Sequence, residues 1–392
     1  MTDAVGPDTI LEAARAMIPE LRERAGETEA NRKLLPETHD AFLKAGFYRV
    51  MQPRGFGGLE MPFGIQTEMS MELARACPSS AWVAGLLACH GWLLGMMPGE
   101  AQEEVWGGDP ETCVATSFAG SEISVERTSG GYRISGLWPF SSGVDYCKWA
   151  ILVANLPADD GSVEAPHYMV VPLDDCRIVD TWNATGLAGT GSNDIAVVGA
   201  FVPDRRVARF AALCAGEGPG CAVNPGYLYR LPQMAVFSFN LVGVAIGAAR
   251  GAVEHLTGSL RPISQATGAP LANQQSIQLR IAESMAEIDA AHALVDRNRR
   301  EIVAWGEAGS FPAVEERVRY RRDNAFAARA CCRAIERLLP ILGGRGLAAG
   351  DPVNRAWRDA NAVARHIALT WDIAGAIQGA VALGLPCPDP FV

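Results

Sequence analysis

The chain has 392 residues, of which 49% are hydrophobic and 20% are charged. This length predicts two or three domains of roughly 150 residues each, and the composition excludes a disordered chain. The net charge of −10 argues against nucleic acid or an anionic membrane as the main partner. The N-terminal residues lack a basic stretch followed by an apolar core, so we expect no secretory signal and a cytoplasmic protein.

Neither the cysteines nor the histidines form a metal-binding pattern. Cys331 and Cys332 are adjacent, the spacing Cys-x-x-Cys does not occur, and no two histidines stand at the spacing of metal ligands. We therefore expect no metal site. The ten cysteines are expected to be reduced thiols that pack as small hydrophobic groups.

Residues 1–112 are predicted to form an N-terminal helical domain. Apolar residues from Ile10 to Leu21 recur at helical spacing, and Pro36 and Gly46 mark the start and the end of another helix. The apolar stretch 65–97 predicts further helix. Within that stretch, the serines of the segment CPSSAW, Ser79 and Ser80, are the expected N-cap residues. Trp82 and His90 follow eight positions apart, on nearly the same helix face.

Residues 113–216 are predicted to form a β domain, and residues 217–392 a C-terminal helical bundle. The middle region contains short runs rich in β-branched and aromatic residues, separated by Gly, Pro, Asp and Asn. Residues 210–230 are expected to be a loop. Helical patterns follow at residues 235–256, from Ile277 to Val295, at 325–342 and within 357–383. The apolar run 234–249 is shorter than the roughly 20 residues of a membrane helix, so we expect a buried helix and no membrane span.

The stretch 342–367 has the sequence LGGRGLAAGDPVNRAWRDANAVARHI. It resembles the last helical region of the acyl-CoA dehydrogenase fold, and LLPETHDAFLKAGFYRVMQPRGFGG, near the N-terminus, resembles the first domain of that fold. The dehydrogenases usually carry a glutamate base at the position of Ile367. The preceding His366 is similar to the flavin-dependent monooxygenases of this fold, the oxygenase components of two-component aromatic hydroxylases of the p-hydroxyphenylacetate and seco-steroid hydroxylase type. The resemblance implies an α+β protein with an N-terminal helical domain, a middle β-barrel domain and a C-terminal four-helix bundle.

The segment Gly136–Gly143, GLWPFSSG, resembles the hydroxylase signature that meets the flavin. The resemblance implies that Trp138 and Phe140 form an apolar wall against the cofactor. A hydroxyl of Ser141 or Ser142 would accept a hydrogen bond from the N–H at flavin N5, and this bond would preserve a C4a-hydroperoxide. The residues themselves leave open which serine does so, and a simple turn between strands is the alternative.

Three glycine-containing segments are further candidates for cofactor binding. The segment GLAGTGSND resembles a family loop that borders the flavin, which implicates Gly189, Thr190, Gly191 and Ser192, although a plain loop fits equally well. Gly343 and Gly344 would allow close backbone approach to a ligand. The pattern Gly344–Ala349 matches a dinucleotide fingerprint, but the preceding segment is predicted to be a helix, so we reject a nicotinamide site.

The segment PLANQQSIQLRIA resembles the start of a dehydrogenase helix that reaches a flavin bound mainly by a neighbouring subunit. Gln275 matches the glutamine of that helix. The family arginine is out of register, because Ser264 occupies its position and Arg261 lies three residues earlier. A solvated helix start is the alternative interpretation.

The chain has six histidines, and His366 and His90 fall where the hydroxylases place histidines around the substrate. An imidazole with a pKa near ~6.5 can take or orient a phenol proton. The nearby Arg355, Arg358 and Asp359 are expected to form a structural ion-pair cluster or an interface.

The predicted function is the oxygenase component of a two-component flavin monooxygenase that hydroxylates a small aromatic, phenolic substrate. It would use O2 and reduced flavin, FMNH2 or FADH2, from a separate flavin reductase, and it would assemble as a homotetramer. One alternative is an acyl-CoA dehydrogenase with tightly bound FAD. Others are an oxygenase acting on nitrogen or sulfur and a flavin-free scaffold of the same fold.

Overall fold

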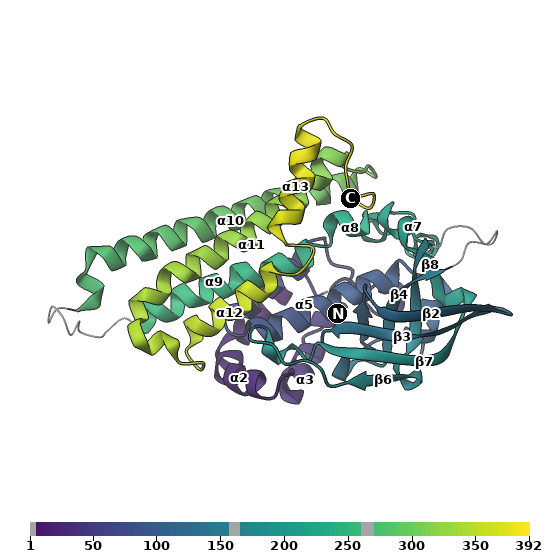
Figure 1. Ribbon diagram of the computed structural model, residues 1–392, viewed down its shortest axis with the longest axis horizontal. Coiled ribbons are helices and arrows are strands. Elements are labelled where there is room, and N and C mark those ends of the chain that lie inside the picture. Colours follow the sequence, from purple (N-terminus) through teal and green to yellow (C-terminus); the bar gives the residue numbers. More distant parts are fainter. Residues whose placement is uncertain (1–4, 157–164, 260–269) are drawn as a thin grey trace.

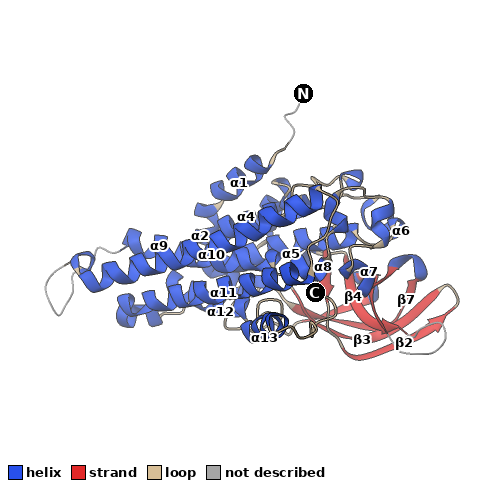
Figure 2. Cartoon of the chain, turned by 90° about the horizontal axis from the view of Figure 1, so that it is seen from above, coloured by secondary structure: helices blue, strands red, loops and turns tan. Residues whose placement is uncertain are grey.

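The computed structural model describes residues 5–156, 165–259 and 270–392 (Figure 1). Arg261 and Ser264 lie outside these residues. The strands gather at one end of an elongated helical body, as the view in Figure 2 shows. The order of elements along the described chain is helical, then mainly β, then helical again, as predicted.

Within the described residues, six α-helices precede the first strand. They are α1 (Pro7–Ala16), α2 (Ile18–Ala30), α3 (Pro36–Lys44), α4 (Ile65–Ala74), α5 (Pro78–Gly95) and α6 (Gly99–Trp106). Helix α5 is buried along its whole length, which explains why its sequence is apolar on every side. The predicted N-cap of α5 at Ser79 or Ser80 is wrong. Cys77 is the N-cap because Pro78 takes the first helical position, where its missing N–H costs nothing.

The middle region consists of two four-stranded sheets around a shared apolar core. One sheet has the order β1–β4–β5–β8, with β1 (Val114–Ser117), β4 (Trp149–Leu156), β5 (Ala165–Pro172) and β8 (Val207–Arg209). The other has the order β2–β3–β7–β6, with β2 (Ser121–Thr128), β3 (Gly131–Ser141), β7 (Asn193–Pro203) and β6 (Cys176–Val179). The pairing of β1 with β4 is parallel and the other pairings are antiparallel. Side chains such as Trp138, Leu152 and Ile195 are fully buried in this core.

The C-terminal helices form a bundle against which the N-terminal helices pack. They are α7 (Phe210–Cys214), α8 (Gln233–Val236), α9 (Phe239–Ser259), α10 (Gln275–Glu307), α11 (Val314–Leu342), α12 (Pro352–Ala364) and α13 (Trp371–Ala382). Helices α9 to α12 are its four main members, in which α9 and α11 contact each other and both α10 and α12, and α4 and α5 contact α9. Residues 233–259 are long and apolar enough to cross a membrane, but 94% of the most apolar window is buried inside the chain, in agreement with the predicted core helix.

Two expected C-terminal features need correction. The segment 210–230 is not only a loop, because it contains α7 and two short 3-10 turns. The predicted last helix is interrupted at residues 365–370, which separates α12 from α13. The Thr370 hydroxyl donates to the carbonyls of Arg365 and His366, and such side-chain bonds compete with continued helix. His366 therefore lies in a turn between two helices.

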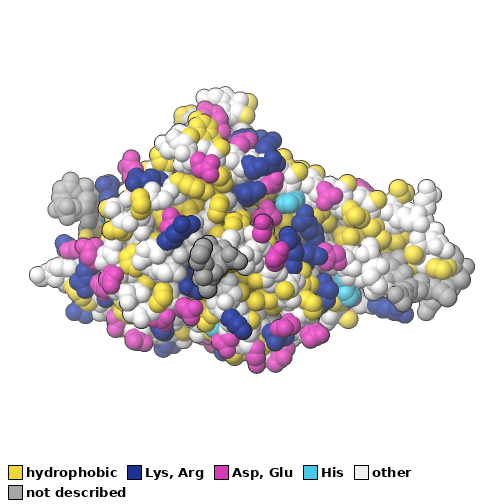
Figure 3. All heavy atoms as spheres, turned by 180° about the vertical axis from the view of Figure 1, so that it is seen from behind, with side chains coloured by type: hydrophobic (Ala, Val, Ile, Leu, Met, Phe, Trp, Pro, Cys, Tyr) yellow, Lys and Arg dark blue, Asp and Glu magenta, His cyan; other side chains and the backbone are white. Residues whose placement is uncertain are grey.

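The surface carries mixed charge on the face drawn in Figure 3. Basic and acidic side chains alternate over that face, with hydrophobic side chains between them.

All ten cysteines are free thiols, and five of them are buried, in agreement with the expected role as small hydrophobic groups.

Candidate functional site

An irregularity in the β3–β7 ladder sets the geometry of the segment Trp138–Ser142. The register shifts between Trp138 and Ser141, and Phe140 adopts a left-handed backbone with φ +63°. Such a backbone is unusual for a residue with a side chain, and it turns Phe140 outward, where 68% of it is exposed, against the edge of Trp182. Phe140 therefore presents the expected apolar surface.

Trp138 does not share that surface, which corrects the prediction for this residue. Its side chain is fully buried between the two sheets, and its indole N–H donates to the carbonyl of Val153 at 2.9 Å. Residues two positions apart in a regular strand face the same side, so the irregularity between Trp138 and Ser141 is what separates the buried Trp138 from the exposed Phe140. Trp138 supports the site from within the β region.

The two candidate serines have different surroundings. Ser141 is fully buried, and its hydroxyl donates to the carbonyl of Thr116 at 2.9 Å. Ser142 retains 6% exposure, and its Oγ accepts the indole N–H of Trp82 at 3.0 Å. The same Oγ lies 2.7 Å from the Oγ of Ser192. Ser142 is therefore the serine that keeps an oxygen available for a further partner.

A chain of hydroxyl groups continues from Ser142 into the protein. Ser192 lies 2.6 Å from the Oγ1 of Thr190, and Thr190 donates to the carbonyl of Leu187 at 2.8 Å. The indole of Trp82 can only donate and the carbonyl can only accept, so each of the three hydroxyls has to donate to the next one. The proton of Ser142 thus points toward Ser192, and one lone pair of its oxygen has no protein donor among the described residues.

The glycine-containing loop contributes hydroxyl groups rather than free backbone donors. The N–H of Gly189 donates to Ser79, that of Thr190 to Leu187, and that of Gly191 to Arg32. A Cβ atom on Gly189 would lie 2.8 Å from the carbonyl oxygen of Thr28, so close packing on α2 requires this glycine. Three N–H groups that could have held a phosphate or the flavin edge are therefore engaged within the chain.

His90 is held rigidly between α5 and β1. Its Nδ1 lies 2.7 Å from the carbonyl of Val114, and its Nε2 lies 2.8 Å from the hydroxyl of Thr116. Burial lowers the pKa of His90 to about 4, so the ring is neutral near pH 7. The carbonyl requires a proton on Nδ1, and Nε2 therefore accepts the proton of the Thr116 hydroxyl.

His366 has the opposite tautomer. Its Nδ1 accepts the N–H of Ala368 at 3.2 Å, which leaves the proton of the neutral ring on Nε2. The ring centroid lies 5.9 Å from those of both Trp82 and Phe237. Burial in these surroundings lowers the pKa of His366 to about 4. His366 is therefore a neutral hydrogen-bond donor beside the indole that binds Ser142.

Several residues of this cluster were not among the predicted site residues. Trp82 was noted only for its spacing from His90, and nothing in the sequence pointed to Thr116 or Phe237. Phe237 lies 5.3 Å, between ring centroids, from Phe118. Phe118 lines an open cavity of about 320 Å³ between β2 and β4. The cavity therefore adjoins the cluster through one aromatic side chain.

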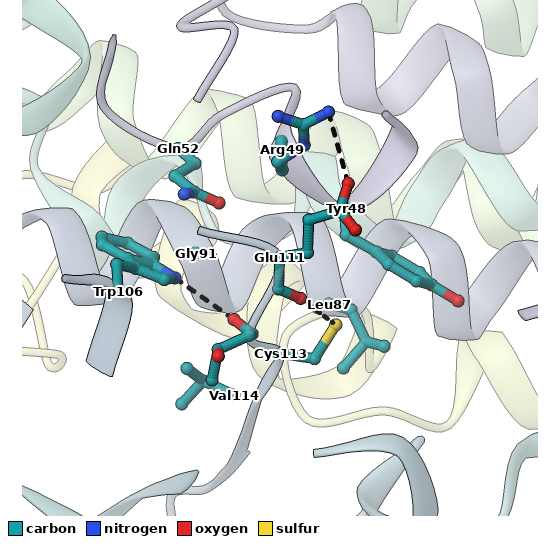
Figure 4. A pocket seen from close by; sticks show the side chains of 10 residues that line it. Tyr48, Arg49, Gln52, Leu87, Gly91, Trp106, Glu111, Cys113 and Val114 are labelled. Carbon is teal, nitrogen blue, oxygen red and sulfur yellow. Dashed lines mark hydrogen bonds and ion pairs between the residues drawn. The ribbon is translucent and has the colours of Figure 1, made fainter. Parts of the chain in front are cut away.

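A second crevice is too small to be the site. It has a volume of about 10 Å³, room for about one water molecule, and is lined by residues that include Tyr48, Trp106 and Val114. Figure 4 shows the Arg49–Glu111 ion pair and the Trp106 indole, which donates to the carbonyl of Thr112, at this crevice. These polar groups already have partners, so the crevice is part of the junction between the N-terminal helices and β1.

The remaining predicted cofactor residues lie away from this cluster. Gln275 is exposed at the start of α10, and a Cβ atom on Gly343 or Gly344 would meet nothing within 4 Å. The start of α10 and the end of α11 lie at the end of the bundle remote from the sheets (Figure 1). One chain alone does not bring these residues to Ser142. Gly343 follows helix α11 directly, as predicted, so this pattern lacks the preceding strand of a dinucleotide fingerprint.

The ion-pair cluster expected at the start of α12 is present. Glu29 of α2 pairs with Arg355, at 2.6 Å, and with Arg358. Asp359 is 2% exposed and accepts the N–H of Leu187 at 2.6 Å. The neighbouring Ile367, at the position of the dehydrogenase base, is 65% exposed and has no group that accepts a proton.

The groups around Ser142 fit a reduced flavin. The oxygen of Ser142 offers a lone pair of the kind that the N5 hydrogen requires, and the exposed ring of Phe140 offers an apolar surface nearby. No group of three or more His, Cys, Asp or Glu side chains that could hold a metal occurs in the described part of the chain.

Comparison with known proteins agrees with this chemistry. Residues 239–371 match the family described as acyl-CoA dehydrogenase, C-terminal domain. The oxygenase component of the FADH2-dependent resorcinol hydroxylase of Rhizobium sp. (strain MTP-10005) is 37% identical over 377 residues, covering 93% of this chain and 91% of the relative. The crystal structure of the HsaA monooxygenase from M. tuberculosis matches with a TM-score of 0.92 and 32% identity, covering 99% of this chain and 100% of that one. XiaF from Streptomyces sp., solved with FADH2 and glycerol, matches with a TM-score of 0.89 and 27% identity over 98% and 97% of the two chains.

The chain therefore belongs to the family of flavin-dependent monooxygenases that share the acyl-CoA dehydrogenase fold. More narrowly, it is similar to the oxygenase components of two-component aromatic hydroxylases. The predicted fold class, enzyme class and reduced-flavin cofactor are confirmed, and the dehydrogenase alternative is set aside.

The buried carboxyl of Asp359 predicts a pH-dependent stability. Burial raises its pKa to about 7 from the ordinary value of 3.8. Between these two values the unfolded chain has released the proton that the folded chain keeps, so the stability of the wild type should fall as the pH rises through this window. The variant Asp359→Asn should lack this decline, as denaturant unfolding at several pH values would reveal.

The charged and titratable neighbours of Asp359 remain in that variant, and their contributions cancel in the comparison. They are Arg355 and Arg358 on α12, Glu29 on α2 and Cys77 at the start of α5. Parallel stability curves for the two proteins between about pH 4 and pH 7 would contradict a raised pKa.

Proposed function

We propose that this protein hydroxylates a small phenolic substrate, with Ser142 binding the N5 side of the reduced flavin and His366 orienting the phenol. Bound reduced flavin, FMNH2 or FADH2, supplies the activation of O2 and the transfer of one oxygen atom. A separate flavin reductase delivers it. The observation that carries the proposal is the oriented hydroxyl chain, which leaves Ser142 as an acceptor directly beside the Trp82–His366 pair.

The residues of this chain hold and orient the reacting groups. The Nε2–H of His366 donates to the phenol oxygen and stabilises the negative charge that makes the ring a better nucleophile. Trp82 and Phe237 pack beside the imidazole and exclude water from it. His90 acts through Thr116. Its Nδ1 is bonded to the carbonyl of Val114, and its Nε2 contacts only the Thr116 hydroxyl among the described residues.

The choice of a phenol rests on this donor and on the relatives. Resorcinol, named for the Rhizobium hydroxylase, is a phenol. A neutral imidazole donor suits a phenol oxygen, and nothing in the site favours a nitrogen or sulfur substrate. The open cavity beside Phe118 gives room for ring substituents remote from His366.

The proposed assembly is a homotetramer in which Gln275, Gly343 and Gly344 serve a flavin bound mainly by a neighbouring subunit. The apolar helix α9 is buried within its own chain and offers no surface for this assembly. The assembly is supported by exposed apolar residues on and after the outer helices: Leu279, Met285, Ile373, Leu383 and Leu385. Cytoplasmic localisation stays a prediction.

Replacing Ser142 by Ala should uncouple oxygen consumption from hydroxylation. A single hydrogen bond of this type is worth about 0.5–1.5 kcal/mol, which corresponds to an increase of up to roughly tenfold in the ratio of H2O2 to product. The measurement supplies reduced flavin, O2 and a phenol, and quantifies both products. Ser141→Ala is the matched control, because the buried Ser141 hydroxyl bonds only Thr116 among the described residues, and this variant should lower the melting temperature without changing the ratio.

Replacing His366 by Ala should abolish most hydroxylation while reduced flavin still binds. Loss of the donor that stabilises the charge on the phenol oxygen should cost about 10²-fold or more in product formation. A more alkaline buffer should restore part of it by ionising the phenol in solution. His90→Ala should mainly weaken substrate affinity, and His255→Ala on α9 serves as the control. Normal coupling in His366→Ala at neutral pH would contradict the proposed placement of the substrate.

Light scattering should give the mass of a tetramer. The double variant Leu279→Glu, Leu383→Glu should shift the mass to smaller species, because charges replace side chains that are 61% and 80% exposed in the single chain. Val198→Glu is the control, since Val198 is 88% exposed but lies on β7 away from the bundle. A monomer mass for the wild type at all concentrations would refute the assembly.

A further inference from the structure

Asp359 carries a buried carboxyl group that joins α12 to the loop carrying Thr190 and Ser192. Its Oδ1 accepts the N–H of Leu187 at 2.6 Å, and its Oδ2 has no partner within the described residues. The preceding Arg358 donates to the carbonyl of Thr185 at 2.8 Å. Arg358 and Asp359 of α12 therefore both bond to the backbone at the start of this loop.

Leu187 is the residue on which the hydroxyl chain ends. It has the left-handed values φ 52° and ψ 32°, which a residue with a side chain adopts only when its surroundings impose them. Its carbonyl accepts the Thr190 hydroxyl at 2.8 Å and the Trp182 indole at 3.0 Å. Asp359 fixes the opposite side of the same residue through the N–H.

We propose that Asp359 is a positioning residue, which sets the direction of the hydroxyl chain at Ser142 by holding Leu187. With Leu187 fixed, its carbonyl faces Thr190, so Thr190 donates inward and accepts from Ser192. Ser192 in turn accepts the proton of Ser142. When Leu187 is released, Thr190 loses its acceptor, and the Ser142 proton no longer has one preferred direction.

This role of Asp359, on α12, rests on the proposed role of Ser142. Asp359 contacts neither Ser142 nor Ser192 in any described hydrogen bond, so its effect has to pass through Leu187. A purely structural Asp359 would stabilise the fold without any specific relation to Ser142. The two roles therefore differ in how substitutions at the two positions combine.

The first test uses the flavin-free protein. Hydrogen–deuterium exchange of the Leu187 amide should be at least tenfold faster in Asp359→Ala than in the wild type, because the N–H loses its acceptor. Asp359→Asn should restore slow exchange, since its side-chain oxygen can accept the same bond. Asp323→Ala is the matched control. Asp323 is 3% exposed and bonds Arg297, Asn298 and Arg322, all on α10 or α11.

The second test is a double-substitution cycle on coupling. Asp359→Ala should raise the ratio of H2O2 to product as Ser142→Ala does, and the double variant should be no worse than the more severe single one. Asp359→Asn should stay within about twofold of the wild type. The proposal would be overturned if the two substitutions raised the ratio of H2O2 to product by independent factors that multiply in the double variant. It would also be overturned if folded Asp359→Ala showed unchanged hydrogen–deuterium exchange at the Leu187 amide.

Thr190→Val keeps the proposal testable if Asp359→Ala does not fold. It removes the hydroxyl that links Leu187 to Ser192 while leaving Asp359 intact, and it should reproduce the loss of coupling without adding to Ser142→Ala. Full coupling in Thr190→Val would overturn the proposal. A wild type that hydroxylates no phenol would refute the proposed function instead, while the exchange result would still decide whether Asp359 holds Leu187.

Discussion

In the proposed function, the hydroxyl of Ser142 presents a lone pair with its proton turned away, and the hydrogen bonds around it favour this orientation. A hydroxyl group rotates freely unless its partners differ in kind. Here a group that only donates, the Trp82 indole, lies on one side, and a path that ends at a carbonyl lies on the other. The direction of the hydrogen bonds is therefore set by the two end groups, the Trp82 indole and the Leu187 carbonyl. The residues between them need only be hydroxyls at hydrogen-bond distance.

Helix α5 connects this chain to the rest of the fold. It is buried on all sides, and its three polar side chains that face the β region each bond to it: Ser79 to Gly189, Trp82 to Ser142, and His90 to Val114 and Thr116. An apolar helix with a few fixed polar groups holds those groups rigidly, because neighbouring side chains leave little room for rotation. The helical and β regions are therefore parts of one site.

The sequence predicted the order of elements, the family and the segment containing Ser142, since these depend on local patterns. It could not choose between Ser141 and Ser142, because the partners of the two hydroxyls depend on a register shift in β3 and on residues of other elements. It misplaced Trp138 for the same reason. Thr116, Phe237 and the partner of Asp359 come from distant parts of the chain, and no local pattern reports such contacts. The residues that would serve another subunit cannot be placed from one chain at all.

The two neutral histidines complement each other because their backbone partners differ. A carbonyl fixes the proton of His90 on Nδ1, whereas an amide N–H fixes that of His366 on Nε2. Burial lowers both pKa values to about 4, so neither ring carries a positive charge near pH 7 that would compete with the other or attract water. The His90 ring therefore fixes the Thr116 hydroxyl as a donor toward its Nε2, while His366 presents its Nε2–H as a hydrogen-bond donor. In the proposed site, the negative charge that develops on a phenol oxygen beside His366 is stabilised by that donor, without a prior change of tautomer in either histidine.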